Sequence, residues 1–397
     1  MSYSHRSLSR LFFIVSAAAF SLVVLFLVRR YPIVSRSRQL YDGAVSKVHL
    51  PDDDINNATL GFGQILVVNM PSRTDHRDAL SLAAALSKMR LDWVDGVHGK
   101  DVLDKVMPPG LAGGKLNDGS KGAWRAHLNA LSTPSSSVIQ QNISSALIFE
   151  DDVDWDWRIR SQLRDFAKSS RALLQPLKSE PSSYADKTYQ SPKDESIEQV
   201  ELQLDNLPPT LTPHISPYGD AWDVLWLGHC GMRLPSAPPL PRGRVIHEHD
   251  DTVPEIRHLS SITEGDDNVK TTYPAFTRVV HHARDPYCSL AYAVTQSGAR
   301  RILYQLGIKS LDGPFDVSLK QLCEGSEGRE HHTCLAVSPP FFTHHRPRGS
   351  MSADSDITSH GDEVREQAVT GNIQQSVKMN FEALLRGDTT LEDQFPP

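Results

Sequence analysis

The densest group of chemically active side chains in this sequence is the run Glu150, Asp151, Asp152, Val153 and Asp154. An apolar run at residues 146–149 precedes it, so the carboxylates stand at the end of a predicted buried strand. Crowded carboxylates repel one another and must be solvated, paired or bound to a metal. Because Mg²⁺ and Mn²⁺ take carboxylate oxygens and bridge to phosphates, the run indicates either a metal site for a nucleoside diphosphate or a solvated acidic loop.

A calcium loop and a zinc motif both lack residues that they require in this sequence. A calcium loop would place Asp152, Asp154 and Asp156 at positions 1, 3 and 5, but positions 6 and 12 then hold Trp and Leu instead of Gly and Glu, which excludes it. The 17 histidines form no H-E-x-x-H zinc motif. One late histidine, His344 or His345, could complete a Mn²⁺ shell, because imidazole also serves such metals.

Alternating strands and helices are expected to position the acidic run. Helical composition is found at residues 78–90, 122–131 and 298–306, and a further helix opens at Asp316. The expected strands are residues 65–68, 91–94, 146–149, 223–228 and 289–294. This alternation predicts an α/β fold with a mostly parallel sheet flanked by helices, and ligands bind such sheets at the carboxyl ends of the strands.

Composition limits the class of protein. The chain has 397 residues, of which 39% are hydrophobic and 22% charged, values that exclude full disorder, a collagen-like chain and a multi-span membrane protein. Lys and Arg number 41 against 48 Asp and Glu, giving a net charge of −7. We therefore expect no nucleic-acid partner.

Residues 11–28 contain no charged residue and would form a helix of about 27 Å, enough to span a bilayer core. A signal peptide is the alternative, but the run continues directly into Arg29 and Arg30 without an A-x-A cleavage site, which favours an uncleaved anchor. The predicted organisation is a short cytosolic tail (1–10), a transmembrane anchor (11–28), a stem (29–60), a domain (61–350) and a polar tail (351–397). The domain contains proline-rich, low-complexity insertions at about 176–217 and 233–268.

Signals for the orientation of the chain disagree. Lys and Arg counts on the two sides of residues 11–28 slightly favour a cytosolic C-terminal part. Glycosylation sequons at Asn57 and Asn142, and the presence of four cysteines, favour an oxidising lumen. The residues alone leave this question open.

The cysteines, at positions 230, 288, 323 and 334, allow three pairings. In a lumen we expect Cys323 to pair with Cys334, closing a short loop, and Cys230 to pair with Cys288. Free buried thiols are the alternative. Since no C-x-x-C or other catalytic signature surrounds them, a catalytic cysteine is not expected.

Six motif-like segments follow one another in order across residues 63–350: ILVVNMPSRTDHR (65–77), VDGV (94–97), GAWRAHL (122–128), LIFEDDV (147–153), AYAV with GA (291–299) and GPFD (313–316). Together they resemble glycosyltransferase family 25, in which the first segment reads I-N-L-x-R-x-x-D-R and the last four read G-x-x-x-S-H, E-D-D-V, a-Y-v-i-s-x-x-G-A and P-V-D. Ala126 and Phe315 stand where that family usually has Ser and Val. A string at 227–231 and the late Ser355-Asp356-Ile357 resemble a fungal branch of the family.

The resemblance implies a GT-A-like fold and a single-pass type II protein of the Golgi or endoplasmic reticulum membrane, with its catalytic domain in the lumen. It implies transfer of a hexose, typically galactose, from a UDP-sugar to a hydroxyl of a glycan or glycoprotein acceptor. The expected reaction inverts the anomeric carbon and uses Mn²⁺ or Mg²⁺. Carried over by position, Glu150, Asp151 and Asp152 form the metal and nucleotide-sugar motif, with Asp152 contacting the metal and Asp154 helping.

The same resemblance places Asn69, Arg73, Asp75 and Arg77 in the loop that holds the nucleotide, where the donor fork of arginine suits phosphate or nucleobase contact. His127 falls at the family's helix histidine. The alternatives are an ordinary solvated loop for the arginines and a satisfied helix histidine for His127.

An inverting transfer needs a general base for the acceptor hydroxyl. Asp316 is the candidate through its resemblance to the P-V-D element, helix capping is its alternative role, and Asp285 is a weaker candidate. A catalytically inactive lumenal protein that binds sugars or partners is the rival function, favoured by Ala126, Phe315 and the insertions. A nucleotide-sugar hydrolase is a more distant rival. The intact acidic run and Asp316 oppose the inactive protein.

Overall fold

The computed structural model describes residues 52–110, 116–132, 138–139, 143–260, 267–358 and 360–396. Residues 50–397 fall within one compact unit. The predicted anchor at residues 11–28 and most of the predicted stem lie outside the described residues. Among the residues that are described, no helix combines the length and apolar character needed to cross a membrane.

The core of the unit is a large mixed sheet, mostly parallel, which confirms the predicted α/β class. Within the described residues its main path holds nine strands, seven of which run in one direction while β11 and β9 run in the other. In spatial order they are β2 (Asp92–Asp95), β1 (Gln64–Asn69), β3 (Ser145–Glu150), β11 (Ala291–Thr295), β6 (Val224–Gly228), β12 (Cys334–Ser338), β9 (Arg278–His282), β8 (Arg244–His247) and β5 (Glu201–Gln203).

A branch of the sheet forms at the carboxyl end of β6. There β13 (Phe342–Arg346) pairs with β6 at Phe342, and antiparallel with β4 (Val153–Trp155) and β16 (Val369–Thr370). Two small antiparallel pairs lie outside the sheet: β7 (Gly231–Arg233) with β10 (Arg284–Tyr287), and β14 (Gly349–Ser350) with β15 (Val364–Arg365). Through these pairings β13 lies at the edge of the sheet where the acidic run ends.

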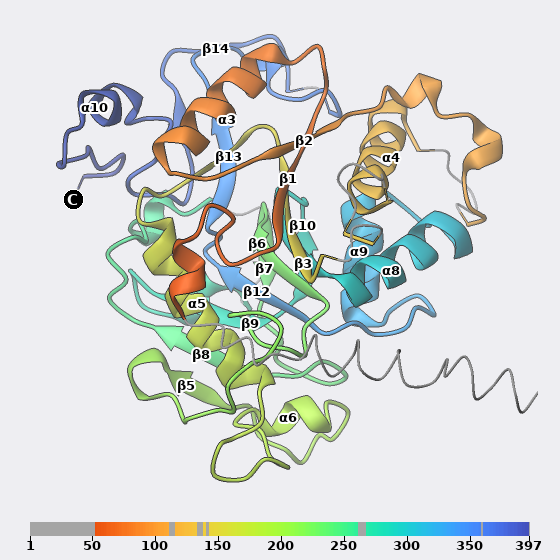
Figure 1. Cartoon of the computed structure of the whole chain (residues 1–397), viewed down its shortest axis with the longest axis vertical. Helices are drawn as coiled ribbons and strands as arrows, with labels where there is room; N and C mark the ends of the chain where they lie inside the picture. The colour runs from red at the N-terminus through yellow and green to blue at the C-terminus, as the bar shows by residue number, and fades with distance from the viewer. Residues whose placement is uncertain are drawn as a thin grey trace, which may run out of the picture. The chain divides into compact units, whose positions relative to one another are not determined.

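Helices cover both faces of the sheet (Figure 1). The helices α3 (Thr74–Leu86) and α5 (Ile159–Leu174) lie on one face, and α4 (Asp118–Ser132), α8 (Gln296–Tyr304) and α9 (Phe315–Glu324) lie on the other. Strand alternation divides the core accordingly: Val67 packs with the first set of helices and Leu66 with the second. The remaining helical segments are α6 (Lys187–Gln190), α7 (Val269–Thr272), α10 (Phe381–Arg386), the 3₁₀ turns η1 (Asp52–Asn56), η2 (Gly99–Asp101), η3 (Asp104–Val106), η4 (Leu204–Asn206), η5 (Ile256–His258) and η7 (Met351–Ala353), and the π turn η6 (Gln305–Lys309).

Both predicted low-complexity insertions contribute strands to the sheet. Residues 176–217 supply the edge strand β5, and residues 233–268 supply β8, which pairs with β5 and β9. β8 has only two consecutive apolar residues, Val245 and Ile246, between polar and proline-rich stretches. That pattern is too short to show a period in the sequence.

The polar segment predicted as a tail folds back onto the domain. The backbone N–H of Val377 donates to the carbonyl of Trp155, and the side chain of Val377 is buried in the main core. Ser376, Thr370 and Asn380 are also buried. Hydrogen bonds between polar groups hold much of this segment against the domain. The hydropathy of the sequence does not indicate such contacts.

Candidate functional site

A cleft of about 800 Å³ opens at the carboxyl edge of the sheet. The loops after β1 and β2, helix α4, the ends of β3 and β13, the start of α9 and residues 354–358 border it. The sequence-predicted residues that line it are Arg73, His127, Glu150, Asp151, Asp152 and Asp316. This is the edge at which open α/β sheets bind ligands.

Three residues at one wall of the cleft could hold a metal ion. One potential ligand atom each from Glu150, Asp152 and His344 lie within 4.8 Å of one another. Oδ1 of Asp152 is buried and has no hydrogen-bond partner among the described residues. Its Oδ2 lies 3.1 Å from Arg346 Nη1 and 3.5 Å from His344 Nε2. An unpartnered buried carboxylate oxygen beside a second carboxylate and an imidazole fits Mn²⁺ or Mg²⁺.

The protonation of this group suits metal binding. Burial opposes ionisation of Asp152, but the neighbouring His344, when it is protonated, and the permanently charged Arg346 hold the pKa of its carboxyl below the usual value. Burial lowers the pKa of His344, against the opposing charge of Asp152. At neutral pH the carboxylate is therefore ionised and the imidazole neutral, as metal ligands must be.

Asp151 differs from its neighbour because protein groups occupy both of its oxygens. Asn69 Nδ2 donates to Oδ2 at 2.7 Å, and His76 Nδ1 donates to Oδ1 at 2.9 Å. Asn69 is buried and does not line the cleft. The two hydrogen bonds join the residue after β3 to the end of β1 and to the start of α3.

Arg73 reaches across the mouth of the cleft. Its Nη1 donates to Asp356 Oδ2 at 2.9 Å, and its Nε and Nη2 donate to the carboxylate of Asp75 at 3.0 and 2.9 Å. Asp75 is exposed, and the hydrogen bonds from Arg73 lower its pKa to about 2. Arg77 lies outside the lining, with its guanidinium 4.6 Å from the ring centre of Trp93. Of these predicted nucleotide-loop residues, Arg73 lines the cleft, and Asp75 orients the guanidinium of Arg73.

Asp154 is not a metal helper, contrary to the prediction. It is completely buried, and its carboxylate accepts hydrogen bonds from the hydroxyls of Ser376 and Thr370 and from the backbone N–H of Lys378. Burial raises the pKa of Asp154, with the nearby Lys378 opposing. Because Asp154 lies within β4, its side chain points to the opposite side from its strand neighbours. Its role is to anchor the C-terminal segment.

His344 and His345 are neighbours in strand β13, so their side chains point to opposite sides. His344 joins the metal group, while His345 Nδ1 contacts Thr370 Oγ1 at 2.9 Å and lies 3.9 Å from Asp154. Arg346, two residues beyond His344, returns to the cleft, and sequence reasoning missed it. The two-residue period of a strand was the signal that could have identified it.

Asp316 lies on a separate element from the metal group. It is the second residue of α9, after the N-cap position Pro314, so it is not itself the cap. Its Oδ2 accepts from the backbone N–H of Cys288 at 3.0 Å, and its Oδ1 accepts from its own neighbour Val317 at 2.9 Å. Asp285, the weaker candidate base, pairs with Lys320 at 2.9 Å and does not line the cleft.

His127 is a buried histidine at the floor of the cleft. Its ring stacks on Phe315 with centres 4.4 Å apart, and its Nδ1 lies 3.1 Å from the hydroxyl of Tyr292. Its Nε2 lies 3.5 Å from Glu150 Oε1. These contacts make it a satisfied helix histidine that also supports a metal-group carboxylate.

Both predicted disulfides form, Cys230–Cys288 and Cys323–Cys334. The first lies in the wall of the cleft.

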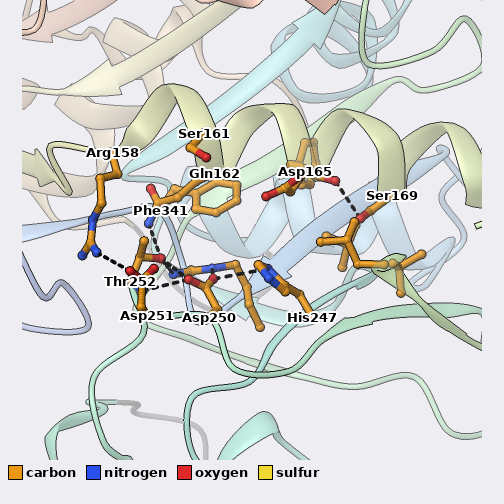
Figure 2. A pocket seen from close by; sticks show the side chains of 15 residues that line it. Arg158, Ser161, Gln162, Asp165, Ser169, His247, Asp250, Asp251, Thr252 and Phe341 are labelled. Atoms are coloured by element: carbon orange, nitrogen blue, oxygen red, sulfur yellow. Dashed lines mark hydrogen bonds and ion pairs between the residues drawn. The ribbon is translucent and has the colours of Figure 1, made fainter. Parts of the chain in front are cut away.

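A second cavity, of about 270 Å³, lies between α5 and the strands β8 and β9 (Figure 2). Its charged groups neutralise one another: Arg278 Nε lies 2.6 Å from Asp250 Oδ2, and Arg158 Nη1 lies 3.2 Å from Asp251. Although Asp250 is buried, the charge of Arg278 lowers its pKa to about 2. Because these charges are paired, this cavity is a weaker candidate for a functional site than the cleft.

Neither the models of known protein families nor the curated proteins contain a match to this chain.

Proposed function

We propose that this chain is a metal-dependent, inverting glycosyltransferase with a GT-A-like fold, similar to family 25. It would transfer a hexose, galactose being the expected sugar, from a UDP-sugar to a hydroxyl of a glycan or glycoprotein. The observation that carries the proposal is the unpartnered buried oxygen of Asp152 beside Glu150 and His344, in a cleft that also holds Asp316.

In the proposed reaction, the bond between the sugar's anomeric carbon and the UDP oxygen breaks as the acceptor oxygen bonds that carbon from the opposite face. Asp316 takes the proton of the acceptor hydroxyl. Glu150, Asp152 and His344 would hold the divalent cation, whose charge neutralises the departing diphosphate. Arg73 and Arg346, which line the same cleft, add positive charge beside the diphosphate.

The proposed setting is the lumen of the Golgi or endoplasmic reticulum, with the chain anchored by residues 11–28. Two disulfides involving all four cysteines support an oxidising compartment. The sequon asparagine Asn57 lies on the exposed surface, which agrees with that setting.

Calorimetry on the full-length chain with UDP-galactose, with and without Mn²⁺, tests the proposal. We expect binding that requires Mn²⁺ and that weakens by at least about tenfold in Asp152→Asn, because metal affinity depends on that carboxylate. Asp251→Asn, an exposed acidic residue of the second cavity, is the matched control and should bind as the unmodified chain does. A folded chain that binds no UDP-sugar would refute the transferase proposal, and binding without UDP release would favour the inactive sugar-binding protein.

A further inference from the structure

The two disulfides lie in different surroundings. Cys230 and Cys288 are half-buried and line the cleft, whereas Cys323 and Cys334 are only 1% and 3% exposed and belong to the core. Cys230 stands between β6 and β7, and Cys288 stands between β10 and β11. The first bridge therefore joins two segments, 58 residues apart in the chain, at the edge that carries the site.

The segment that begins at Cys288 contacts groups from two parts of the site. The backbone N–H of Cys288 donates to Asp316 Oδ2 at 3.0 Å. The next residue, Ser289, donates its hydroxyl to Glu150 Oε1 at 2.9 Å, and the carbonyl of Leu290 accepts from the backbone N–H of Glu150 at 2.9 Å. Three consecutive residues thus hold both the proposed base and one proposed metal ligand.

The other half of the bridge contacts a second metal ligand. Cys230 Sγ lies 3.9 Å from Nδ1 of His344, and Nε2 of the same ring faces Asp152 at 3.5 Å. The backbone N–H of Cys230 also donates to the carbonyl of Tyr287 at 2.8 Å. A hydrogen bond from the second nitrogen of a ligand histidine fixes the orientation of its ring, and here the disulfide sulfur is the atom that faces Nδ1.

The backbone of Cys288 needs support from its surroundings. Its φ of +65° lies in the left-handed region, which is unfavourable for a non-glycine residue. The disulfide, the hydrogen bond to Asp316 and a 3.0 Å hydrogen bond from Trp226 Nε1 to the Cys288 carbonyl keep it there. Opening the bridge removes one of these constraints and allows the N–H to turn away from Asp316.

We propose that the Cys230–Cys288 disulfide is a positioning element of the site, which holds His344, Glu150 and Asp316 in their mutual arrangement across the cleft. It acts through these residues and takes no part in the chemistry itself. The inference rests on the proposed function.

The test compares two double variants of the full-length chain, Cys230→Ser with Cys288→Ser and, as the matched control, Cys323→Ser with Cys334→Ser. Mn²⁺ affinity is measured by electron paramagnetic resonance without sugar, and kcat is measured from UDP release. We expect the first variant to bind Mn²⁺ at least about tenfold more weakly and to lose kcat, as when other supports of metal ligands are removed. The control should keep its Mn²⁺ affinity even if its melting temperature falls.

Partial reduction gives a second measurement that needs no mutation. Because Cys230 and Cys288 are half-buried and the other pair is buried, limited dithiothreitol should open the first bridge first. Dithiothreitol supplies two electrons and two protons, becoming a cyclic disulfide while the bridge becomes two thiols. Mn²⁺ affinity should fall in proportion to the thiols trapped on Cys230 and Cys288, and it should return on reoxidation.

An unchanged Mn²⁺ affinity with this bridge open would overturn the inference alone, provided that the unmodified chain binds Mn²⁺ and UDP. An equal loss in the control variant would also overturn it, because the effect would then be one of general stability. If the unmodified, folded chain binds neither Mn²⁺ nor UDP, the proposed function fails and the inference fails with it.

Discussion

Asp316 retains room to accept a proton. Each of its oxygens accepts one backbone hydrogen bond, from Cys288 and from Val317, and a carboxylate oxygen has two lone-pair positions. The carboxylate is thus fixed in orientation while one position on each oxygen is left. Asp151, by contrast, receives side-chain donors on both oxygens and links the turn after β3 to β1 and α3. The roles of these two carboxylates follow from their donors.

Replacing Asp316 with Asn should lower kcat by about 10²- to 10⁴-fold, the usual contribution of a general base. The amide keeps the shape of the side chain but cannot take the proton. Because Asp316 is not part of the metal group, Mn²⁺ and UDP affinities should stay unchanged. UDP release from UDP-galactose with a mixed glycoprotein acceptor pool measures kcat, and calorimetry measures the affinities. Asp285→Asn is the control and should keep kcat; a loss of kcat there, with kcat kept in Asp316→Asn, would make Asp285 the better candidate.

At the scale of elements, the two sides of strand β13 have different roles: one faces the proposed metal group, and the other contacts residues that stabilise the fold. Its alternation directs His344 and Arg346 toward Asp152, and His345 toward Thr370 and Asp154. In the partner strand β4, Asp154 faces the same C-terminal segment. β13 therefore presents a proposed ligand on one side, and both strands present structural polar contacts on the other.

A pair of variants on β13 separates these roles. His344→Ala should weaken Mn²⁺ binding by at least about tenfold, since it removes a ligand. His345→Ala should leave Mn²⁺ affinity unchanged and lower the free energy of unfolding by about 1 kcal/mol, the cost of a lost hydrogen bond. Spin-resonance titration and urea unfolding measure the two quantities. The reverse pattern would contradict the assignment of His344 to the metal group.

On the scale of the whole molecule, several histidines are packed into the core in neutral form. Burial lowers the pKa of His229 to about 4, and of His281 and His345 to about 3. His281 shows how this is achieved: its ring nitrogens contact the carbonyl of His282 at 2.8 Å and the hydroxyl of Ser338 at 3.0 Å. A neutral imidazole satisfies both contacts, donating to the carbonyl and accepting from the hydroxyl.

These histidines predict loss of stability in mild acid. Their unfolded forms take up protons near pH 6.5, whereas the folded forms remain neutral until about pH 4 or below. The unfolded state then binds more protons, so the free energy of unfolding should fall as pH drops from about 6.5 to 4, by up to about 1.4 kcal/mol per pH unit for each histidine. Urea unfolding across this range measures the slope. His281→Asn should reduce it by about one proton, and an unchanged slope would show that His281 is already charged in the folded state.

Local pattern was sufficient to predict much of this protein. Apolar runs of four to six residues predicted β1, β3 and β6, because a strand buried on both faces must be apolar at every position, whereas β9 and β12 were not predicted. The acidic run after β3 predicted a cleft at the carboxyl edge, because parallel strands present their ends together. The cysteine pairing was also predicted correctly.

Tertiary structure decided what each polar residue does. Asp152 and Asp154 are two residues apart, and what separates them is the branch of the sheet and the returning C-terminal segment, both formed by residues more than 180 positions later in the chain. Likewise β8 forms a strand because it pairs with β9 and packs against α5. The sequence determines which side chains are available near each strand end. Long-range packing determines which of them face the cleft and which keep an atom or a lone pair available to a ligand.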